Sequence, residues 1–334
     1  MVTGKRVAQT LLLSGPEGVG KATLARRFAG MLVGAASSID LARIEHDDLS
    51  LETNQQIITD REKWPSDKRN EDPLFFSSHP DVVTFPPEGP LRQISIQQMR
   101  LLKERASLKP LKGAWRVFVI DGIDRANEAA ANSVLKTLEE PPSHLVLIMT
   151  ARNPYDLLPT IRSRAVPFAL GRLNDEEMRA FAAARKLDDS DRRLRLAEGS
   201  PGVALSLDLE TYDRRREAML ALLRAASGLE PFGKWLKHSE SIAARRTEKL
   251  DSYLEVLYAL LEDLLRLANG AGPLRNEDIR AQLAPLAGRV TFEWLRAAVA
   301  RVDELAELVR RNIQKSIALD AFAAALRAHE TLCY

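Results

Sequence analysis

The segment Gly15-Pro16-Glu17-Gly18-Val19-Gly20-Lys21 has the residue types and the spacing of a phosphate-binding loop, or P-loop. Glycines allow backbone N–H groups to curl around an anion, and the lysine can reach the outer phosphates of a nucleotide. The apolar run Leu11–Leu13 precedes the loop and a helical pattern follows it, so the helix would point its positive dipole end at the same anion. We therefore predict a P-loop, although the spacing alone also fits an ordinary strand–helix turn.

The residues that would hold Mg²⁺ and activate water are altered in this sequence. A working P-loop carries Ser or Thr after the lysine to bind the metal, but here that position is Ala22. Thr23 comes one place later, where a helix has turned by about 100°, so we expect it to face away from the metal. The apolar run 117–120 ends at Asp121, as in a buried strand that delivers a metal-binding carboxylate or caps the next helix. Gly122 then replaces the glutamate that polarises water in hydrolysing proteins of this kind.

The first half of the chain alternates short apolar runs with helical patterns. The apolar runs are typical of strands and cover 10–13, 81–85, 117–120, 145–149 and 166–168. The helical patterns between them cover 21–33, 94–108 and 125–140. Strands separated by helices favour parallel pairing, so we predict an α/β fold with a doubly wound parallel sheet. The polar stretch 34–78 lacks periodicity, and we expect an insertion there with one short helix.

The second half shows no strand pattern and is predicted to be helical. Residues 174–186 and 191–207 form two short helical patterns around a turn at 199–202. Beyond residue 211, long amphipathic patterns dominate. One apolar face holds Leu250, Leu254, Leu257, Leu261, Leu264 and Leu265, and another holds Phe292, Leu295, Val299, Val302, Leu305 and Val309. We interpret both faces as the core of a helix bundle, and an oligomerisation surface on that bundle stays open.

Composition and charge narrow the class of protein. The chain has 334 residues, enough for two or three domains, and 45% hydrophobic residues with 28% charged residues are typical of a globular protein. A net charge of +2 does not by itself indicate nucleic-acid binding. The single cysteine, Cys333, excludes a disulfide within the chain, and the five histidines show no metal-ligand spacing. Without an apolar run of about 18 residues or a signal-peptide pattern, we expect a cytoplasmic protein with no membrane span.

Three motifs resemble those of a known family. They are Leu135-Lys136-Thr137-Leu138-Glu139-Glu140-Pro141-Pro142, the strand at 145–149, and Leu157-Leu158-Pro159-Thr160-Ile161-Arg162-Ser163-Arg164. They resemble bacterial DNA polymerase III clamp-loader subunits, which are AAA+ proteins of DNA replication. The resemblance implies an AAA+ P-loop α/β domain over 1–170, a small helical lid over 171–210 and an all-α collar domain over 211–334. It places the insertion 34–78 where many family members carry a four-cysteine zinc module.

The family includes an ATP-hydrolysing gamma/tau type and a stator-like delta prime type, and the departures of this chain resemble the second. Ala22 lacks the metal-binding hydroxyl, and Gly122 lacks the water-activating carboxylate. The run 198–205 is similar to the second sensor region, where the active type has an arginine that contacts the gamma-phosphate; here the position is Gly202. The resemblance therefore implies a subunit that binds no more than a structural nucleotide and hydrolyses none.

Ser163-Arg164 resembles the Ser-Arg-Cys motif that carries an arginine finger, with Ala165 in place of the cysteine. The resemblance implies that Arg164 is the catalytic contribution of this chain and acts in trans, on the ATP of a neighbouring gamma/tau subunit. The alternative is that Arg162 and Arg164 form a solvated basic turn, since arginines are common on protein surfaces.

Expectations for cofactors and partners follow from the same resemblance. The degenerate nucleotide site would consist of Gly15, Gly18, Gly20, Lys21, Thr23 and Asp121. No cofactor is expected to be required, residual ATP or ADP binding stays open, and neither zinc nor another metal is expected. The implied partners are gamma/tau and delta subunits in the DNA polymerase III holoenzyme, with the sliding clamp and primer–template DNA reached through the assembly. The alternative function is an active P-loop ATPase of the gamma/tau type that uses Thr23 and Asp124 in shifted roles.

Overall fold

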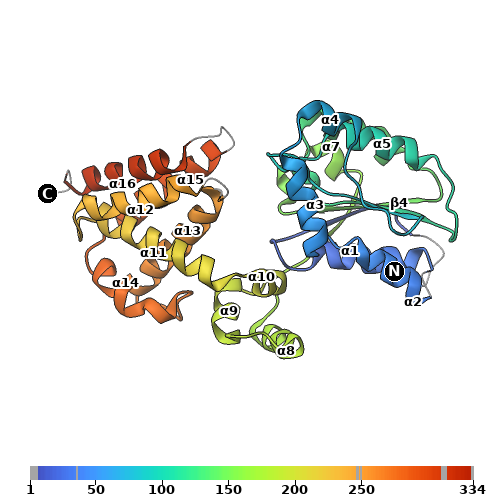
Figure 1. Cartoon of the computed structure of the whole chain (residues 1–334). Coiled ribbons are helices and arrows are strands. Elements are labelled where there is room, and N and C mark those ends of the chain that lie inside the picture. Colours follow the sequence, from blue (N-terminus) through green and yellow to red (C-terminus); the bar gives the residue numbers. More distant parts are fainter. Residues whose placement is uncertain (1–6, 35–36, 246–247, 249, 310–313, 332–334) are drawn as a thin grey trace. The chain divides into compact units, whose positions relative to one another are not determined.

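The computed structural model describes residues 7–34, 37–245, 248, 250–309 and 314–331 (Figure 1). The chain divides into two compact units, one of residues 1–184 and 199–203 and the other of residues 185–198 and 204–334. The first unit holds the sheet, and the second is helical. The stretch 171–210 is therefore divided between the two units. Cys333 lies outside the described residues.

Within the described residues, five strands form one parallel sheet in the order β2-β3-β4-β1-β5. The strands are β1 (Thr10–Ser14), β2 (Val82–Phe85), β3 (Arg116–Ile120), β4 (Leu145–Ala151) and β5 (Val166–Ala169). Every residue of β1 to β4 is buried, whereas β5 at the edge is mostly exposed and contains Pro167, as edge strands tolerate. The predicted parallel sheet is confirmed, and every predicted apolar run lies on a strand.

Helices cover both faces of the sheet because alternate residues of each strand point to opposite sides. Leu12 belongs to the apolar cluster that includes α5 (Ile96–Ala106) and α6 (Glu128–Glu139). Leu11 and Leu13 belong to the cluster that includes α1 (Lys21–Leu32). With both faces buried, the strands need apolar side chains at every position, which explains their continuous apolar runs. The shorter elements of this unit are η1 (Ile123–Arg125), η2 (Pro154–Asp156) and α7 (Pro159–Arg162).

The described part of the insertion 34–78 folds into three helices, so the prediction of one short helix was wrong. They are α2 (Ser38–His46), α3 (Glu52–Glu62) and α4 (Ser66–Glu71). A small apolar cluster that includes Ile58 holds these helices together with buried polar contacts, and the polar share explains why their apolar periodicity is weak. Asn54 is 1% exposed and donates to the carbonyl oxygens of His46 and Asp48, and the buried Arg61 pairs with Glu88.

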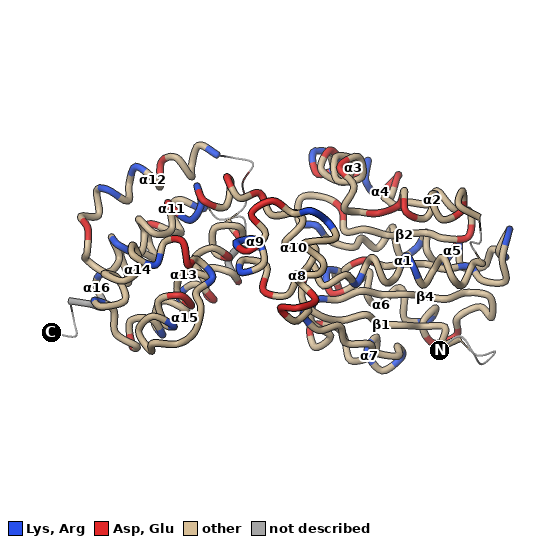
Figure 2. Tube along the Cα trace, turned by 90° about the horizontal axis from the view of Figure 1, so that it is seen from below, with Lys and Arg blue, Asp and Glu red and all other residues tan. Residues whose placement is uncertain are grey.

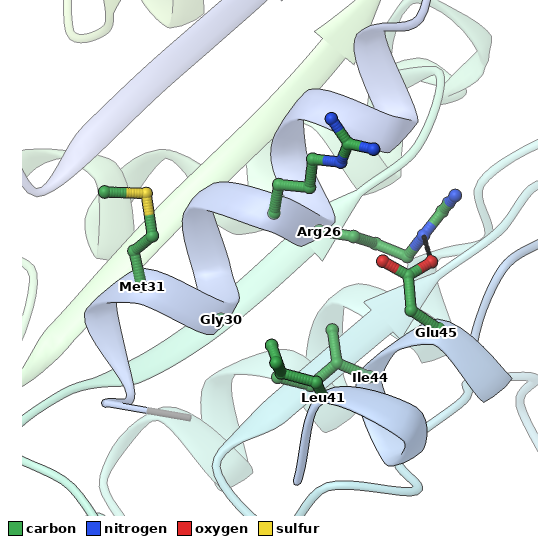
Figure 3. A pocket seen from close by; sticks show the side chains of 7 residues that line it. Arg26, Gly30, Met31, Leu41, Ile44 and Glu45 are labelled. Carbon is green, nitrogen blue, oxygen red and sulfur yellow. Dashed lines mark ion pairs between the residues drawn. The ribbon is translucent and has the colours of Figure 1, made fainter. Parts of the chain in front are cut away.

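A pocket of about 270 Å³ lies between α1 and α2 (Figure 3). Its lining consists of Arg26, Arg27, Gly30, Met31, Leu41, Ile44 and Glu45. Arg26 is almost fully buried and pairs with Glu45, which fastens α2 to α1. The predicted phosphate-binding residues do not line this pocket.

The helices that follow the sheet build the second unit and part of the first. They are α8 (Asp175–Arg185), α9 (Ser190–Ala197), α10 (Pro201–Ser206), α11 (Leu209–Ala226), α12 (Phe232–Ala244), α13 (Leu250–Ala268), η3 (Glu277–Ile279), α14 (Arg280–Ala287), α15 (Phe292–Val309) and α16 (Lys315–Thr331). The core of the helical unit contains Trp235 of α12, Leu257 of α13 and Phe322 of α16. The predicted helix bundle is confirmed.

Three residues of the predicted apolar faces lie at the surface instead of in the core. Leu265 is 37% exposed, Phe292 65% and Val299 39%. Leu265 directly follows the buried Leu264, so the turn of the helix carries it away from the core. On α15 the buried side is formed by Trp294, Leu295, Ala298 and Val302. The side chain of Val309 lies outside the described residues.

Basic and acidic residues are interspersed along both units (Figure 2), in line with the net charge of +2. Within the described ranges, no helix is both long enough and apolar enough to cross a membrane.

Candidate functional site

The predicted P-loop connects β1, which ends at Ser14, to α1, which begins at Lys21. Its glycines are required by the backbone. Gly15 has a φ of 145°, and a Cβ there would lie 2.2 Å from the carbonyl oxygen of Leu170. Gly18 has a φ of 75°, and a Cβ there would lie 2.8 Å from the side chain of Val203. Only glycine fits such positions, because they combine a left-handed backbone with a close neighbour.

The Lys21 ammonium folds back onto its own loop. Its Nζ donates to the carbonyl oxygens of Gly15 at 2.7 Å and of Pro16 at 2.6 Å. Burial lowers the pKa of Lys21, and the carboxylates of Asp121 and Glu17 act in the opposite direction. The lysine can therefore reach the outer phosphates of a nucleotide only by giving up these two hydrogen bonds.

The two residues after the lysine differ in their surroundings. Ala22 is half-buried and supplies no hydroxyl, and Thr23 is exposed on α1. The exposure of Thr23 agrees with the rotation expected from a one-residue shift on a helix.

Asp121 follows β3 and is bonded to the neighbouring strand. Its Oδ1 accepts from Oγ1 of Thr150 at 2.7 Å, and the same hydroxyl oxygen accepts from the backbone N–H of Gly122 at 2.8 Å. Burial raises the pKa of Asp121, although the Thr150 hydrogen bond and the Lys21 charge oppose this effect. The predicted next helix corresponds to α6, and its N-cap is Asn127, whose Oδ1 accepts from the backbone N–H of Ala130 at 2.8 Å; the alternative that Asp121 caps this helix is wrong.

Asp124 and Arg152 form a second link between the ends of the strands. The Oδ2 of Asp124 accepts from the backbone N–H of Arg152 at 3.0 Å. The Arg152 guanidinium in turn pairs with Glu17 of the P-loop at 2.6 Å. The backbone after β4 thus engages Oδ2 of Asp124, whereas Oδ1 of the same carboxylate is buried without a hydrogen-bond partner in the described part of the chain.

Gly202 lies against the P-loop, within the same unit. Its backbone N–H donates to the carbonyl oxygen of Gly18 at 2.8 Å. A Cβ on Gly202 would lie 2.9 Å from that oxygen and 3.0 Å from the Cα of Gly18. Backbone occupies the space into which an arginine at this position would have to project.

Arg164 lies in the turn after α7, where three acceptors surround its guanidinium. Nη2 lies 2.6 Å from Oε1 of Glu139, and Nη1 donates to the carbonyl oxygen of Thr160 at 2.8 Å. Nη1 also lies 3.3 Å from Oγ of Ser163. The side chain is 32% exposed and contacts three acceptors, so Arg164 is a partly exposed, hydrogen-bonded arginine rather than a freely solvated one.

The P-loop and Arg164 lie at opposite ends of the parallel strands. Arg164 comes two residues before β5 begins, whereas the P-loop follows the end of β1, and the two strands are parallel. The paired stretch from Leu11 and Val166 to Ser14 and Ala169 separates the two ends by about 10 Å, at about 3.3 Å per residue. The structure therefore places the P-loop glycines, Lys21 and Asp121 at the same ends of the parallel strands, leaves Thr23 exposed on α1, and does not bring Arg164 to them.

Known proteins resemble this chain over most of its length. The family model described as DNA polymerase III, delta subunit, matches residues 1–174. The DNA polymerase III subunit delta' of Escherichia coli K12 is 30% identical over 233 residues, which cover 69% of this chain and 68% of that protein. The chain belongs to the delta prime type of DNA polymerase III clamp-loader subunits.

Other relatives match shorter parts of this delta prime type chain. The delta' subunit of Pseudomonas aeruginosa PAO1 is 30% identical over 48% of the chain and 42% of its own length. The gamma/tau subunit of Mycobacterium tuberculosis H37Rv is 38% identical over 26% of the chain and 15% of its own length. A solved gamma-subunit-related protein of Thermotoga maritima aligns over 97% of this chain and 96% of its own, with 19% identity and a TM-score of 0.45.

Sequence reasoning missed Thr150 and Arg152, and it quoted Glu139 within a motif without assigning it a contact. Thr150 and Arg152 stand at the end of a predicted strand, and the ends of neighbouring parallel strands meet at one edge, so the strand order would have revealed them. The motif 135–142 did not reveal the contact of Glu139 with Arg164, because that contact depends on how α6 packs beside α7.

Proposed function

We propose that this chain is a non-hydrolysing delta prime subunit that assembles with gamma/tau and delta subunits to load the sliding clamp on primed DNA. Its own P-loop would take no part in hydrolysis, and Arg164 would act as an arginine finger on the ATP of a neighbouring gamma/tau subunit. Membership in the delta prime type supports the assembly, and the altered P-loop supports the loss of hydrolysis.

Three positions support the loss of hydrolysis independently. Ala22 has no hydroxyl for Mg²⁺, and Gly122 has no carboxylate to activate water. Gly202 is packed so closely on Gly18 that an arginine could not occupy its place without moving the loop. The chain would thus lack the metal ligand, the general base and the arginine that contacts the gamma-phosphate.

The position of Arg164 carries the proposal that this chain acts on a neighbour. The arginine lies at the N-terminal ends of the strands, away from the altered P-loop of its own chain. An arginine in this place can serve a nucleotide only if another subunit presents one. In well-studied phosphoryl-transfer systems, such a finger stabilises developing charge and accelerates the reaction by about 10³–10⁵.

The proposal requires no cofactor on this chain. The candidate residues for residual ATP or ADP are Gly15, Gly18, Gly20, Lys21, Thr23 and Asp121. Lys21 would have to exchange its bonds to Gly15 and Pro16 for bonds to phosphate. Such binding would be structural, since Gly122 stands where hydrolysing proteins of this kind carry the water-activating glutamate.

The test uses the reconstituted complex of this chain with its gamma/tau and delta partners. Arg164→Ala is expected to lower the DNA-stimulated ATPase rate at least about tenfold. Arg100→Ala, which removes an exposed arginine from α5 of the same unit, is the matched control and should leave the rate unchanged. An unchanged rate with Arg164→Ala would refute the finger.

The purified chain alone tests the rival function. We expect no Mg²⁺-dependent ATP turnover above background. Turnover that disappears in Lys21→Ala would contradict the proposal and favour an active ATPase of the gamma/tau type.

A further inference from the structure

Glu139 ends helix α6 in an electrostatically unfavourable place. The C-terminal end of a helix carries a partial negative charge, so a carboxylate there is destabilising unless a cation lies beside it. Glu140 follows directly and adds a second negative charge at the same end. Arg164 supplies the cation, because its Nη2 lies 2.6 Å from Oε1 of Glu139. The pair joins the end of α6 to the turn after α7.

Among the acceptors that the described residues offer to Arg164, only Glu139 comes from α6. Thr160 lies in α7 and Ser163 in the turn after it, so both acceptors of Nη1 are within four residues of Arg164. Glu139 binds Nη2 from the side of α6. A guanidinium is a planar, rigid fork, so acceptors at both of its terminal nitrogens fix the plane and its direction.

We propose that Glu139 is a positioning residue for the arginine finger, an inference that rests on the proposed function of Arg164. Its carboxylate holds the guanidinium in one orientation at the N-terminal ends of the strands before the subunit complex brings a neighbour's nucleotide to it. A long arginine side chain otherwise samples many rotamers and must lose that freedom when it meets the phosphate. With Glu139 in place, that ordering is completed when the chain folds, so the assembled site starts closer to its reactive geometry.

The partial exposure of the pair allows this role. The side chains of Arg164 and Glu139 are 32% and 46% exposed, so a phosphate can approach the guanidinium without unfolding α6 or α7. Partly exposed ion pairs are also weak enough to be shared with a second anion. Glu139 thus orients the arginine without sequestering it.

The variant Glu139→Gln keeps the size of the side chain and removes its charge. In the reconstituted complex, it is expected to lower kcat of DNA-stimulated ATP hydrolysis about three- to fivefold, the upper range for a partly exposed pair. KM for ATP should change little, because the finger acts on developing charge rather than on ATP binding. Glu139→Asp, which keeps the charge on a shorter side chain, should recover part of the rate. Glu140→Gln is the matched control and should keep the rate of the unmodified complex.

A double-mutant cycle with Arg164→Ala decides the inference. Glu139→Gln should lower kcat when Arg164 is present and have no further effect when it is absent. Equal losses in both backgrounds, or no loss in either, would overturn the positioning role and leave the finger in place. If Arg164→Ala alone has no effect, the finger itself fails and the inference falls with it. Co-elution with the partner subunits on size-exclusion chromatography verifies that every variant assembles.

Discussion

Gly202→Ala tests whether the lid turn is packed on the P-loop as tightly as the structure indicates. The added Cβ would lie 2.9 Å from the carbonyl oxygen of Gly18 and 3.0 Å from its Cα. Both atoms belong to backbone, so a rotating side chain cannot relieve the contact. The turn must instead move away and weaken the hydrogen bond from the Gly202 N–H to the Gly18 oxygen.

The expected loss follows from three terms. Overpacking costs about 1–3 kcal/mol, and the weakened hydrogen bond costs about 1 kcal/mol. Alanine gains about 1 kcal/mol over glycine in a helix, and Gly202 lies within α10. The free energy of unfolding of the sheet-containing unit should therefore fall by about 2 kcal/mol. For a unit of this size, that corresponds to a decrease in Tm of about 4–8 °C.

Thermal unfolding of the whole chain, followed by circular dichroism or calorimetry, measures the effect. Gly171→Ala is the matched control in the same unit, because a Cβ there would meet nothing within 4 Å. Its Tm should stay level or rise slightly. A Gly202→Ala variant that unfolds at or above the temperature of the unmodified chain would refute the reasoning, and with it the explanation for the missing arginine.

Two further predictions concern carboxylates whose pKa values are shifted in the folded chain. Burial raises the pKa of Asp121, so the folded state binds the proton more tightly, and ionisation of Asp121 lowers stability as the pH rises above about 4. Asp121→Asn should therefore flatten this decline in Tm as the pH rises above about 4, and a decline as steep as in the unmodified chain would contradict the prediction. Burial opposes ionisation of Glu248, but hydrogen bonds from Tyr253, Arg214 and Arg215 prevail and lower its pKa to about 2. Glu248→Gln should cost about 2 kcal/mol at pH 7, and this deficit should shrink as the pH falls from about 5 towards 2; a deficit independent of pH would contradict the ionic origin.

The sheet could be predicted from sequence because its strands are buried on both faces. Runs such as 117–120 and 145–149 are apolar at every position, so pattern alone revealed them. The helices of the insertion 34–78 could not be predicted in the same way, because the buried side of α3 mixes the polar Asn54 and Arg61 with the apolar Ile58 and leaves no continuous apolar stripe. The exposure of Phe292 likewise depends on which side of α15 meets the rest of the bundle.

In the candidate site, too, residue types could be read from the sequence, but contacts that depend on packing could not. The gaps at Ala22, Gly122 and Gly202 are visible in the sequence, because they depend only on residue type at a known spacing. The contact between Gly202 and Gly18 joins residues far apart in the chain, and the pair of Glu139 with Arg164 depends on helix packing. Neither could be derived before the elements were placed in space.

The parallel pairing of β1 with β5 gives the sheet-containing unit a head and a tail. The head is the side where the strands end, which carries the P-loop, and the tail is the side where they begin, which carries Arg164. Related units stacked head to tail form a directional array in which two molecules complete each joint, as heterologous interfaces do. On the proposed function, a subunit that keeps Arg164 but has an altered P-loop requires no arginine finger from a further neighbour. Such a member gives the array a defined terminus.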